Sequence, residues 1–329
     1  MTSEAPLMLF ALGATRAFGA RVAAALGTSL SAHEERVFED GEQKTRPLVS
    51  VRGRDVFVIH SLSSDAAESA NDKLVKLLLF VGALRDASAG RITAVVPYLA
   101  YARKDRKSKP RDPVATRYVA QLFEAVGTDC IVTLDVHNVA AFQNAFRCRA
   151  ENLEAASLLA RHLAHQLGGG PIAIVAPDAG AIKRADAFRA RIETLVGATV
   201  TMGFAEKHRS AGVVSGEAFV GDVAGRSVII VDDLISSGTT MVRTAAASRR
   251  HGATRVLAVA THAVFGAGAN EVLASESIDR IVVTDTVSGE RLTAPRVVAK
   301  LERISAVELF AEAIRRLHEG GSLVELMQS

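Results

Sequence analysis

The sequence predicts an α/β fold made of two tandem domains, each with a mainly parallel sheet flanked by helices. Short apolar runs alternate along the chain with longer segments of helical period. Most of the short runs are continuously apolar, as expected for strands buried on both faces of a parallel sheet. The length of 329 residues corresponds to about two domains of ordinary size.

The elements follow one another in a regular order. The predicted strands are the apolar runs at 7–12, 56–61, 92–98, 130–136, 172–177, 227–232, 255–261 and 280–286. The predicted helices are the segments 16–26, 67–85, 114–126, 153–167, 181–192, 239–251 and 307–318. Because helices lie between the strands, we expect right-handed crossovers between parallel strands.

Turn-forming residues punctuate this pattern. An Asp-Gly pair at 40–41, between β-rich stretches, predicts a hairpin. The stretch 210–225 is rich in Gly, Ser and Ala and is predicted to be a long mobile loop. We expect an N-terminal domain over 1–152 and a C-terminal domain over 153–305, with the glycines at 168–170 as an alternative boundary. The final helical segment, about 306–329, is a candidate to pack on the N-terminal domain.

Composition excludes several classes of protein. The apolar runs fall short of the roughly 20 residues of a membrane helix, and the N-terminus lacks the basic region of a secretory signal. Two cysteines, Cys130 and Cys148, are too few for a disulfide scaffold or a cysteine-rich metal site. A net charge of +3 does not indicate nucleic-acid binding. We therefore expect a cytoplasmic protein with no membrane and no nucleic-acid partner.

Positive charge is concentrated in one segment. Residues 103–117 contain seven basic and two acidic side chains, so this segment is +5 and the rest of the chain is −2. A solvated basic loop would explain the pattern as well as a binding role does. A local anionic ligand is the functional interpretation.

The strongest local signal is the run VIIVDDLISSGTT, at 228–240. A buried strand ends in Asp232 and Asp233, whose carboxylates can accept hydrogen bonds from neighbouring sugar hydroxyls. A loop leading into a helix follows, and its residues suit a phosphate: Ser236, Ser237, Gly238, Thr239 and Thr240. An ordinary capped helix is the alternative, because Ser and Thr also cap helices.

Five other segments carry groups of chemically active residues. They are FEDGE (38–42), YARKDRK (101–107), TLDVHN (133–138), PDAGAIKRA (177–185) and AEKHRS (205–210). The loop at 232–240 resembles the phosphoribosyl-pyrophosphate loop of type I phosphoribosyltransferase-fold proteins. Together, and in this order, the segments are similar to those of the ribose-phosphate pyrophosphokinase (phosphoribosyl pyrophosphate synthetase) family over nearly the whole chain.

The resemblance implies a fold and an activity. Each domain is expected to be phosphoribosyltransferase-like. Members of the family transfer the β,γ-diphosphoryl group of ATP to the C1 hydroxyl of ribose 5-phosphate, which supplies nucleotide biosynthesis. They need Mg²⁺ and release AMP.

The resemblance also implies roles for particular residues. Asp232, Asp233 and the loop from Ser236 to Thr240 would hold ribose 5-phosphate, although Ser236 stands where many members have Asp. Lys207 and Arg209 would act on the reacting phosphates, and His137 and Asp178 would associate with Mg²⁺. The residues expected at the ATP site are Phe38, Asp40, Glu42, Arg103, Lys104, Asp105 and Arg106.

Two of these segments depart from the family's pattern. Lys104 replaces a Gln, and the segment AFQNAF at 141–146 differs from the usual one. In the family the FEDGE hairpin reaches a neighbouring subunit's ATP site, so at least a homodimer is implied, and hexamers are common.

Two other functions stay open from the sequence. The first is a catalytically silent homologue that regulates a partner synthetase, and the second is a phosphoribosyltransferase that uses the same loop. Formation of AMP from ATP and ribose 5-phosphate distinguishes an active synthetase from both.

Overall fold

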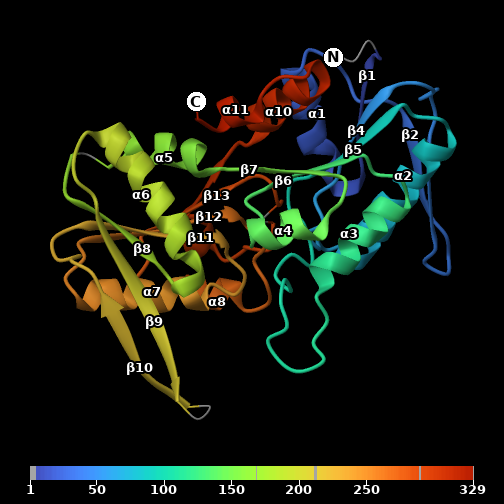
Figure 1. Cartoon of the computed structure of the whole chain (residues 1–329). Helices are drawn as coiled ribbons and strands as arrows, with labels where there is room; N and C mark the ends of the chain where they lie inside the picture. Colours follow the sequence, from blue (N-terminus) through green and yellow to red (C-terminus); the bar gives the residue numbers. More distant parts are fainter. Residues whose placement is uncertain (1–4, 168, 211–212, 289, 329) are drawn as a thin grey trace. The chain divides into compact units, whose positions relative to one another are not determined.

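The computed structural model describes residues 5–167, 169–210, 213–288 and 290–328, with the backbone alone described at 206–210, 213–218 and 328. The chain divides into two compact units (Figure 1): unit 1 comprises Met1–Glu154 with Ala306–Ser329, and unit 2 comprises Ala155–Ser305. The alternative boundary at 168–170 includes Gly168, which lies outside the described residues. Both units are α/β with mainly parallel sheets, so the predicted fold class is confirmed.

Unit 1 is built on a parallel sheet. Its elements are β1 (Leu7–Ala11), the short 3-10 helix η1 (Gly13–Thr15), α1 (Arg16–Ala25), β2 (His33–Val37), β3 (Gln43–Pro47), β4 (Asp55–Ile59), α2 (Ala70–Asp86), β5 (Arg91–Val96), α3 (Ala115–Ala125), β6 (Cys130–Leu134), α4 (Val139–Ala145), β7 (Arg149–Leu153), α10 (Val307–Glu319) and α11 (Leu323–Gln328). Among the described residues the sheet has five parallel strands in the order β1-β4-β5-β6-β7. The strands β2 and β3 pair with each other as a separate antiparallel hairpin.

Helices cover both faces of this sheet. On one face, Phe10 and Val58 join Phe80 of α2 and Phe123 of α3 in one buried cluster. On the other face, α1 lies close against β1, where Gly19 faces Ala11. Alternation of side chains along a strand divides the apolar residues between the two faces.

The C-terminal helix α10 packs on unit 1. The rings of Phe18 and Phe310 meet edge to face with centroids 5.7 Å apart. The Arg91 Nη2 donates to the Leu317 carbonyl at 2.9 Å, and His318 Nδ1 lies 2.7 Å from a carboxylate oxygen of the buried Asp55. Residues from both ends of the chain therefore build unit 1.

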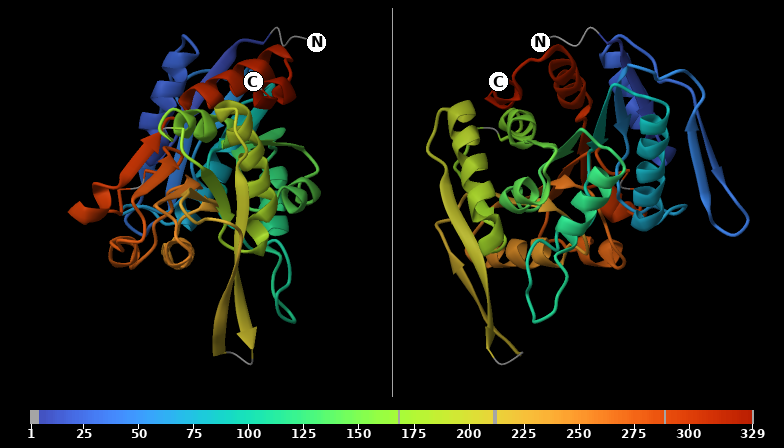
Figure 2. Two further views of the ribbon diagram at one scale, coloured as in Figure 1. Left: turned by 90° about the vertical axis from the view of Figure 1, so that its left-hand side faces the viewer. Right: turned by 45° about the vertical axis from the view of Figure 1, so that its right-hand side comes forward.

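Unit 2 contains the larger sheet. Its elements are α5 (Ala156–Ala164), β8 (Ile172–Ala176), the short 3-10 helix η2 (Ala179–Ala181), α6 (Ile182–Val196), β9 (Thr201–Ser210), β10 (Val213–Val220), β11 (Ser227–Leu234), α7 (Thr239–Arg250), β12 (Arg255–His262), α8 (Ala269–Leu273), β13 (Arg280–Thr284), α9 (Pro295–Val298) and β14 (Leu301–Ile304). The described strands form a seven-stranded sheet in the order β10-β9-β8-β11-β12-β13-β14, parallel except for β10. Figure 2 shows the β9–β10 hairpin (yellow) extending well beyond the rest of unit 2.

The prediction of a long loop over 210–225 is wrong where β10 lies. Residues 213–220 pair antiparallel with β9, from Val213 opposite Ser210 to Val220 opposite Phe204. The Gly, Ser and Ala content of the stretch obscured its β-forming Val and Phe residues. Among the described residues, none of the helices combines the length and apolar character of a bilayer-crossing segment.

Two helical glycines predict opposite effects of the same substitution. Gly-to-Ala in a helix interior ordinarily stabilises a protein by about 0.5–1 kcal/mol. A Cβ on Gly19 would lie only 2.2 Å from the Ala11 Cβ, whereas a Cβ on Gly82 would meet no atom within 4 Å. Overpacking costs about 1–3 kcal/mol, so Gly19→Ala should lower the free energy of unfolding and Gly82→Ala should raise it. Denaturant unfolding of the full chain measures both, and equal effects of the two variants would contradict the packing of α1 on β1.

Candidate functional site

Polar residues of unit 2 gather where neighbouring parallel strands end. The strands β8 and β11 pair in parallel, from Ile172 opposite Ser227 to Val175 opposite Ile230. Asp178 follows β8, while Asp232 and Asp233 lie near the C-terminal end of the strand β11. Carboxyl ends of parallel strands share one edge of a sheet, which is the usual place for a ligand in an open α/β fold.

The paired carboxylates of β11 are held beside an arginine. Arg184 of α6 places Nη1 3.5 Å from Asp232 Oδ1 and 3.9 Å from Asp233 Oδ1. Burial and the neighbouring Asp233 charge raise the pKa of Asp232 to about 8, against the lowering effect of Arg184. The pair therefore keeps a proton at a pH where an isolated carboxyl group is ionised.

The loop after β11 requires glycine at position 238. Gly238 has φ +82° and precedes α7, so its conformation favours glycine. A Cβ there would also lie 2.5 Å from the Leu273 side chain. Thr239 and Thr240 then open a helix of 12 residues, whose first N–H groups and dipole favour an anion.

The segment after β12 is hydrogen-bonded to this loop. The N–H groups of Phe265 and Gly266 donate to the carbonyls of Ile235 and Ser236 at 2.9 and 3.1 Å. Ser237 Oγ and Thr239 Oγ1 lie 3.0 Å apart, so the two hydroxyls are already in contact. The loop is thus held in place before any ligand binds.

Asp178 caps the helix that follows it. Its Oδ1 accepts hydrogen bonds from the N–H groups of Gly180 and Ala181 at 2.9 and 3.2 Å. The side chain is exposed at the same sheet edge as the β11 carboxylates. Capping fixes this carboxylate in one orientation toward solvent.

The basic segment of unit 1 follows β5 and is partly tied to itself. Lys104 Nζ lies 2.6 Å from Asp112 Oδ2, and Thr116 Oγ1 donates to the Tyr101 carbonyl at 3.1 Å. Arg103 and Arg106 are exposed, whereas Lys104 and Asp105 are half-buried. The exposed guanidinium groups can reach an anion, and the charge of Lys104 is partly neutralised by Asp112.

His137 stands on a neighbouring loop, after β6. Asn138 donates from Nδ2 to Asp105 Oδ2 at 2.6 Å, which joins this loop to the basic segment. Asp135 has φ +41°, a left-handed conformation that is costly for a residue other than glycine. Strained residues of this kind gather at binding sites, and here the turn leads directly to the exposed His137.

The predicted hairpin at the FEDGE segment is confirmed. Phe38 N–H donates to the Glu42 carbonyl at 2.8 Å, and Gly41 has φ +90°. Phe38, Asp40 and Glu42 are all exposed at the tip. The Arg36 guanidinium carbon lies 4.7 Å from the centroid of the Phe38 ring.

Lys207 and Arg209 lie on β9, opposite Glu217 and Val214 of β10. Their side chains lie outside the described part of the structure. The strand geometry places the two residues at i and i+2, on the same face of the hairpin.

The donor set at these loops suits a hard cation that keeps most of its water. Within the described residues, no three or more His, Cys, Asp or Glu side chains cluster as a metal cage. Mg²⁺ takes one or two carboxylates and completes its shell with water and phosphate oxygens. The exposed Asp178 carboxylate, fixed by its capping bonds, fits that mode in unit 2, and His137 is the corresponding candidate in unit 1.

Two contacts could not be read from the sequence. Arg184 lies in the PDAGAIKRA segment, and the structure places it against the carboxylates of Asp232 and Asp233. Asn138 was not singled out, yet it joins two loops of unit 1. The position of Arg184, a basic residue in the first turn of the helix after β8, was the sequence signal for a role at this edge of the sheet. No sequence pattern indicated the contact made by Asn138.

Comparisons with known proteins agree along the chain. A family model of the N-terminal domain of ribose phosphate pyrophosphokinase matches residues 7–127, and one of the phosphoribosyl synthetase-associated domain matches residues 214–328. The ribose-phosphate pyrophosphokinase of Granulibacter bethesdensis is 37% identical over 321 residues, covering 97% of this chain and 99% of the relative.

Further relatives extend the match. Ribose-phosphate pyrophosphokinase 1 of Streptococcus pyogenes is 34% identical over 327 residues, covering 99% of both chains. The crystal structure of phosphoribosylpyrophosphate synthetase from Mycobacterium smegmatis superposes with a TM-score of 0.85 at 32% identity, covering 96% of this chain and 99% of that one. The similarity therefore includes both units.

The raised pKa of Asp232 predicts a pH-dependent stability. Between the ordinary carboxyl pKa and about 8, the folded chain holds a proton that the unfolded chain has released. Stability from this pair therefore falls as pH rises through that window. In the absence of ligand, raising the pH from about 5 to about 8 should lower the melting temperature of Asp232→Asn less than that of the wild type.

The matched control is Asp222→Asn, which alters an exposed carboxylate paired with Arg226 at 2.7 Å in the same unit. The melting temperature of each full-length variant is measured across the pH range. Parallel curves for wild type and Asp232→Asn would contradict the proton held by the β11 pair.

Proposed function

The chain belongs to the ribose-phosphate pyrophosphokinase family, and we propose that its two units divide the family's reaction between them. It transfers the β,γ-diphosphoryl group of ATP to the C1 hydroxyl of ribose 5-phosphate, giving 5-phosphoribosyl 1-pyrophosphate and AMP. The observation that carries the assignment of the acceptor site is the Asp232–Asp233 pair, followed by a glycine-dependent loop at the N-terminus of α7.

Ribose 5-phosphate is the ligand of unit 2 in this proposal. The phosphate lies against the N–H groups and hydroxyls of the loop Ser236, Ser237, Gly238, Thr239 and Thr240. The sugar hydroxyls donate hydrogen bonds to Asp232 and Asp233. They take the place of water molecules as donors to these carboxylates. Arg184 balances the two carboxylates and limits the cost of holding them together.

ATP is the ligand of the unit 1 loops. Arg103 and Arg106 donate charge-assisted hydrogen bonds to the polyphosphate, and Lys104 adds positive charge beside them. Asp105, fixed by Asn138, orients the same segment. Phe38 offers a ring face to adenine, while Asp40 and Glu42 accept from donors of the base.

Mg²⁺ is the metal that we assign to the reaction. His137 of unit 1 and Asp178 of unit 2 are each a candidate to associate with such an ion, directly or through water. When bound, the ion neutralises charge on the phosphates of ATP. The Asp178 carboxylate supports this choice, since hard Mg²⁺ prefers oxygen ligands and needs few from the protein.

The transfer step depends mainly on positive charge. The C1 oxygen forms a bond to the β-phosphorus, the bond from that phosphorus to the bridging oxygen of AMP breaks, and AMP departs with the electron pair. The hydroxyl loses its proton, and a loose transition state asks little of a general base. Lys207 and Arg209 stabilise the negative charge that spreads over the transferred group.

A homo-oligomer follows from the same assignment. The FEDGE tip is proposed to complete the ATP site of a second subunit, so at least a dimer is required, and a hexamer is the assembly that we propose. We assign the protein to the cytoplasm, which the two free cysteines, Cys130 and Cys148, support.

The activity is tested by assaying AMP and 5-phosphoribosyl 1-pyrophosphate with purified protein, ATP, Mg²⁺ and ribose 5-phosphate. Formation of both in equal amounts is expected. If both ligands bind but no AMP forms, the protein is a silent homologue of the family. If pyrophosphate release instead depends on an added nucleobase, the protein is a phosphoribosyltransferase.

The role of Lys207 makes a kinetic prediction. Lys207→Ala should lower kcat by about 10²–10³, because an electrostatic contact made mainly in the transition state is lost. The KM for ribose 5-phosphate should change little, since that ligand is held by the 232–240 loop. Steady-state kinetics separate the two effects. Lys207→Arg, which keeps the charge, should recover part of the rate, and a raised KM with normal kcat would contradict the role.

A further inference from the structure

The hairpin that carries the FEDGE tip is not part of the unit 1 sheet. Among the described residues, β2 and β3 pair only with each other, so no ladder of backbone bonds fixes the hairpin to the five-stranded sheet. Figure 2 shows this hairpin (blue) standing out from the rest of unit 1 in the right-hand view. An isolated two-stranded hairpin is marginally stable, so side-chain contacts at its base must set its direction.

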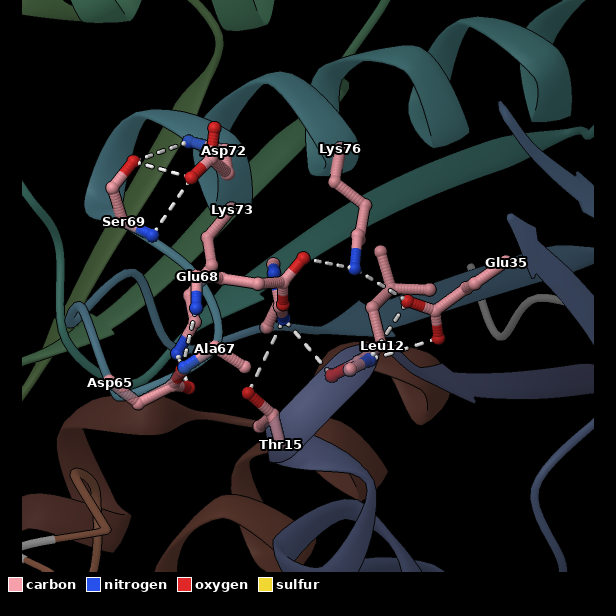
Figure 3. Close-up of polar contacts among 12 residues, drawn as sticks. Leu12, Thr15, Glu35, Asp65, Ala67, Glu68, Ser69, Asp72, Lys73 and Lys76 are labelled. Atoms are coloured by element: carbon pink, nitrogen blue, oxygen red, sulfur yellow. Dashed lines mark hydrogen bonds and ion pairs between the residues drawn. The ribbon is translucent and has the colours of Figure 1, made fainter. Parts of the chain in front are cut away.

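Glu35 of β2 makes most of the polar contacts at that base. Its carboxylate accepts from the Gly13 N–H at 2.9 and 3.1 Å and lies 2.8 Å from His33 Nε2. Lys76 Nζ of α2 lies 3.0 Å from the second carboxylate oxygen. The hairpin is thereby joined to the turn after β1 and to the middle of α2, as Figure 3 shows.

The lysine in this contact is buried. Lys76 is 5% exposed and also lies 2.5 Å from Glu68 Oε1, so its ammonium group sits between two carboxylates. One turn away, the buried Lys73 donates to the Ser63 carbonyl at 2.6 Å. These contacts leave Lys76 little freedom, since its charge must stay paired inside the protein.

The turn after β1 is shaped to receive Glu35. Gly13 has φ +50°, and a Cβ there would lie 3.0 Å from Glu68 Oε2 and 3.5 Å from His60 Cε1. Glycine is therefore needed for both the backbone conformation and the space. Its N–H begins η1, which leads into α1, so the Glu35 carboxylate occupies a helix N-terminus.

Ionisation favours the same arrangement. Burial alone would raise the pKa of Glu35, but hydrogen bonds from His33, Gly13 and Lys76 outweigh it and lower that pKa to about 2. Burial alone would lower the pKa of Lys76, but its hydrogen bonds to Glu68 and Glu35 outweigh burial and raise that pKa. Both groups stay charged over the physiological range.

The outer face of the hairpin offers a contrast. Glu34, the residue before Glu35 in β2, pairs with Lys44 Nζ at 3.5 Å and Arg46 Nε at 2.5 Å, and the two basic side chains are exposed. These bonds join β2 to β3 but connect neither strand to the body of unit 1. Exposed pairs of this kind are worth about 0–1 kcal/mol.

We propose that Glu35 and Lys76 form a positioning latch that fixes the direction of the β2–β3 hairpin and so presents Phe38, Asp40 and Glu42 to the nucleotide in one orientation. Glu35 lies in β2, three residues before Phe38, which directly follows that strand, so a tilt at the latch moves the tip. The inference rests on the proposed nucleotide role of the tip. In this proposal Glu35 and Lys76 act through the position of the tip and not through contact with the nucleotide.

The expected change in the KM for ATP depends on the fraction of molecules whose hairpin has the binding-competent orientation. If loss of the latch leaves the competent orientation in about a tenth of the molecules, the apparent affinity for ATP falls about tenfold. The transition-state contacts of other residues are unchanged once ATP is bound. The expected pattern is therefore a raised KM for ATP with kcat and the KM for ribose 5-phosphate nearly constant.

The experiment compares Glu35→Ala with Glu34→Ala in the full-length protein. The two variants remove the same side chain from adjacent positions on opposite faces of one strand. Glu35→Gln is the milder variant, because it keeps the shape of the side chain and removes only its charge. It serves as the test if Glu35→Ala does not fold. Steady-state kinetics are combined with hydrogen exchange of the amides at 33–47.

The proposal expects Glu35→Ala and Glu35→Gln to raise the KM for ATP about tenfold and about threefold, with faster exchange in the hairpin. Glu34→Ala should change neither. Combining Glu35→Ala with Phe38→Ala should raise the KM for ATP by less than the product of the two separate effects, because the Phe38 ring, one of the groups that the latch positions, is already absent.

The outcomes separate the latch from the function of the tip. Unchanged exchange in both Glu35 variants, or equal effects of Glu34→Ala, would overturn the latch. Faster exchange with an unchanged KM for ATP would instead refute the nucleotide role of the tip, with the latch itself intact. Additive effects of Glu35→Ala and Phe38→Ala would show that Glu35 acts by another route.

Discussion

Parallel pairing of the strands is the constraint on which both sets of loops depend. In unit 1 the ends of β5 and β6 are neighbours, and in unit 2 the ends of β8 and β11 are neighbours. Strands that run in the same direction must release their following loops at one edge of the sheet. Residues separated by dozens of positions, such as Asp105 and Asn138, meet there through this geometry. The continuously apolar strands that bury both faces of the sheet are thus also what assembles the polar edge.

The polar edge costs stability, and the structure offsets that cost locally. Two carboxylates at the end of β11 repel each other, and the shared proton and Arg184 reduce the repulsion without removing it. Asp135 holds an unfavourable backbone conformation next to His137. Both features are consistent with the ligands proposed above, because sugar hydroxyls would donate to the carboxylates and a bound cation would offset their charge.

Central strands and most long helices could be predicted from the sequence, because their pattern is local. The apolar runs at β4, β5, β8 and β12 reflect burial on both faces. The edge strands β7 and β14 were missed, since one side of each is free of a neighbour and charged residues such as Arg149 and Glu302 interrupt them. The strand β10 was missed because small residues hid its pairing with β9.

The candidate site follows a similar division. Asp232, Asp233 and Gly238 could be found because their chemistry is contained in one short segment. The partners that hold such residues could not, because Arg184 and Asn138 meet them only after folding. The roles assigned to individual residues remain predictions, since they concern ligands that bind to these loops.

The Glu35–Lys76 pair illustrates why such partners matter for function. The sequence shows Glu34 and Glu35 as two adjacent acids, and nothing local distinguishes them. Folding sends Glu34 to the surface beside Arg46 and Glu35 inward to Lys76 and the Gly13 amide. The exposed side chains of Lys44 and Arg46 are screened by water, whereas the buried ammonium group of Lys76 disfavours every orientation that separates it from its carboxylate partners. Because β2 and β3 pair with none of the described strands of the sheet, we infer that this penalty gives the hairpin a defined direction, and with it the exposed tip.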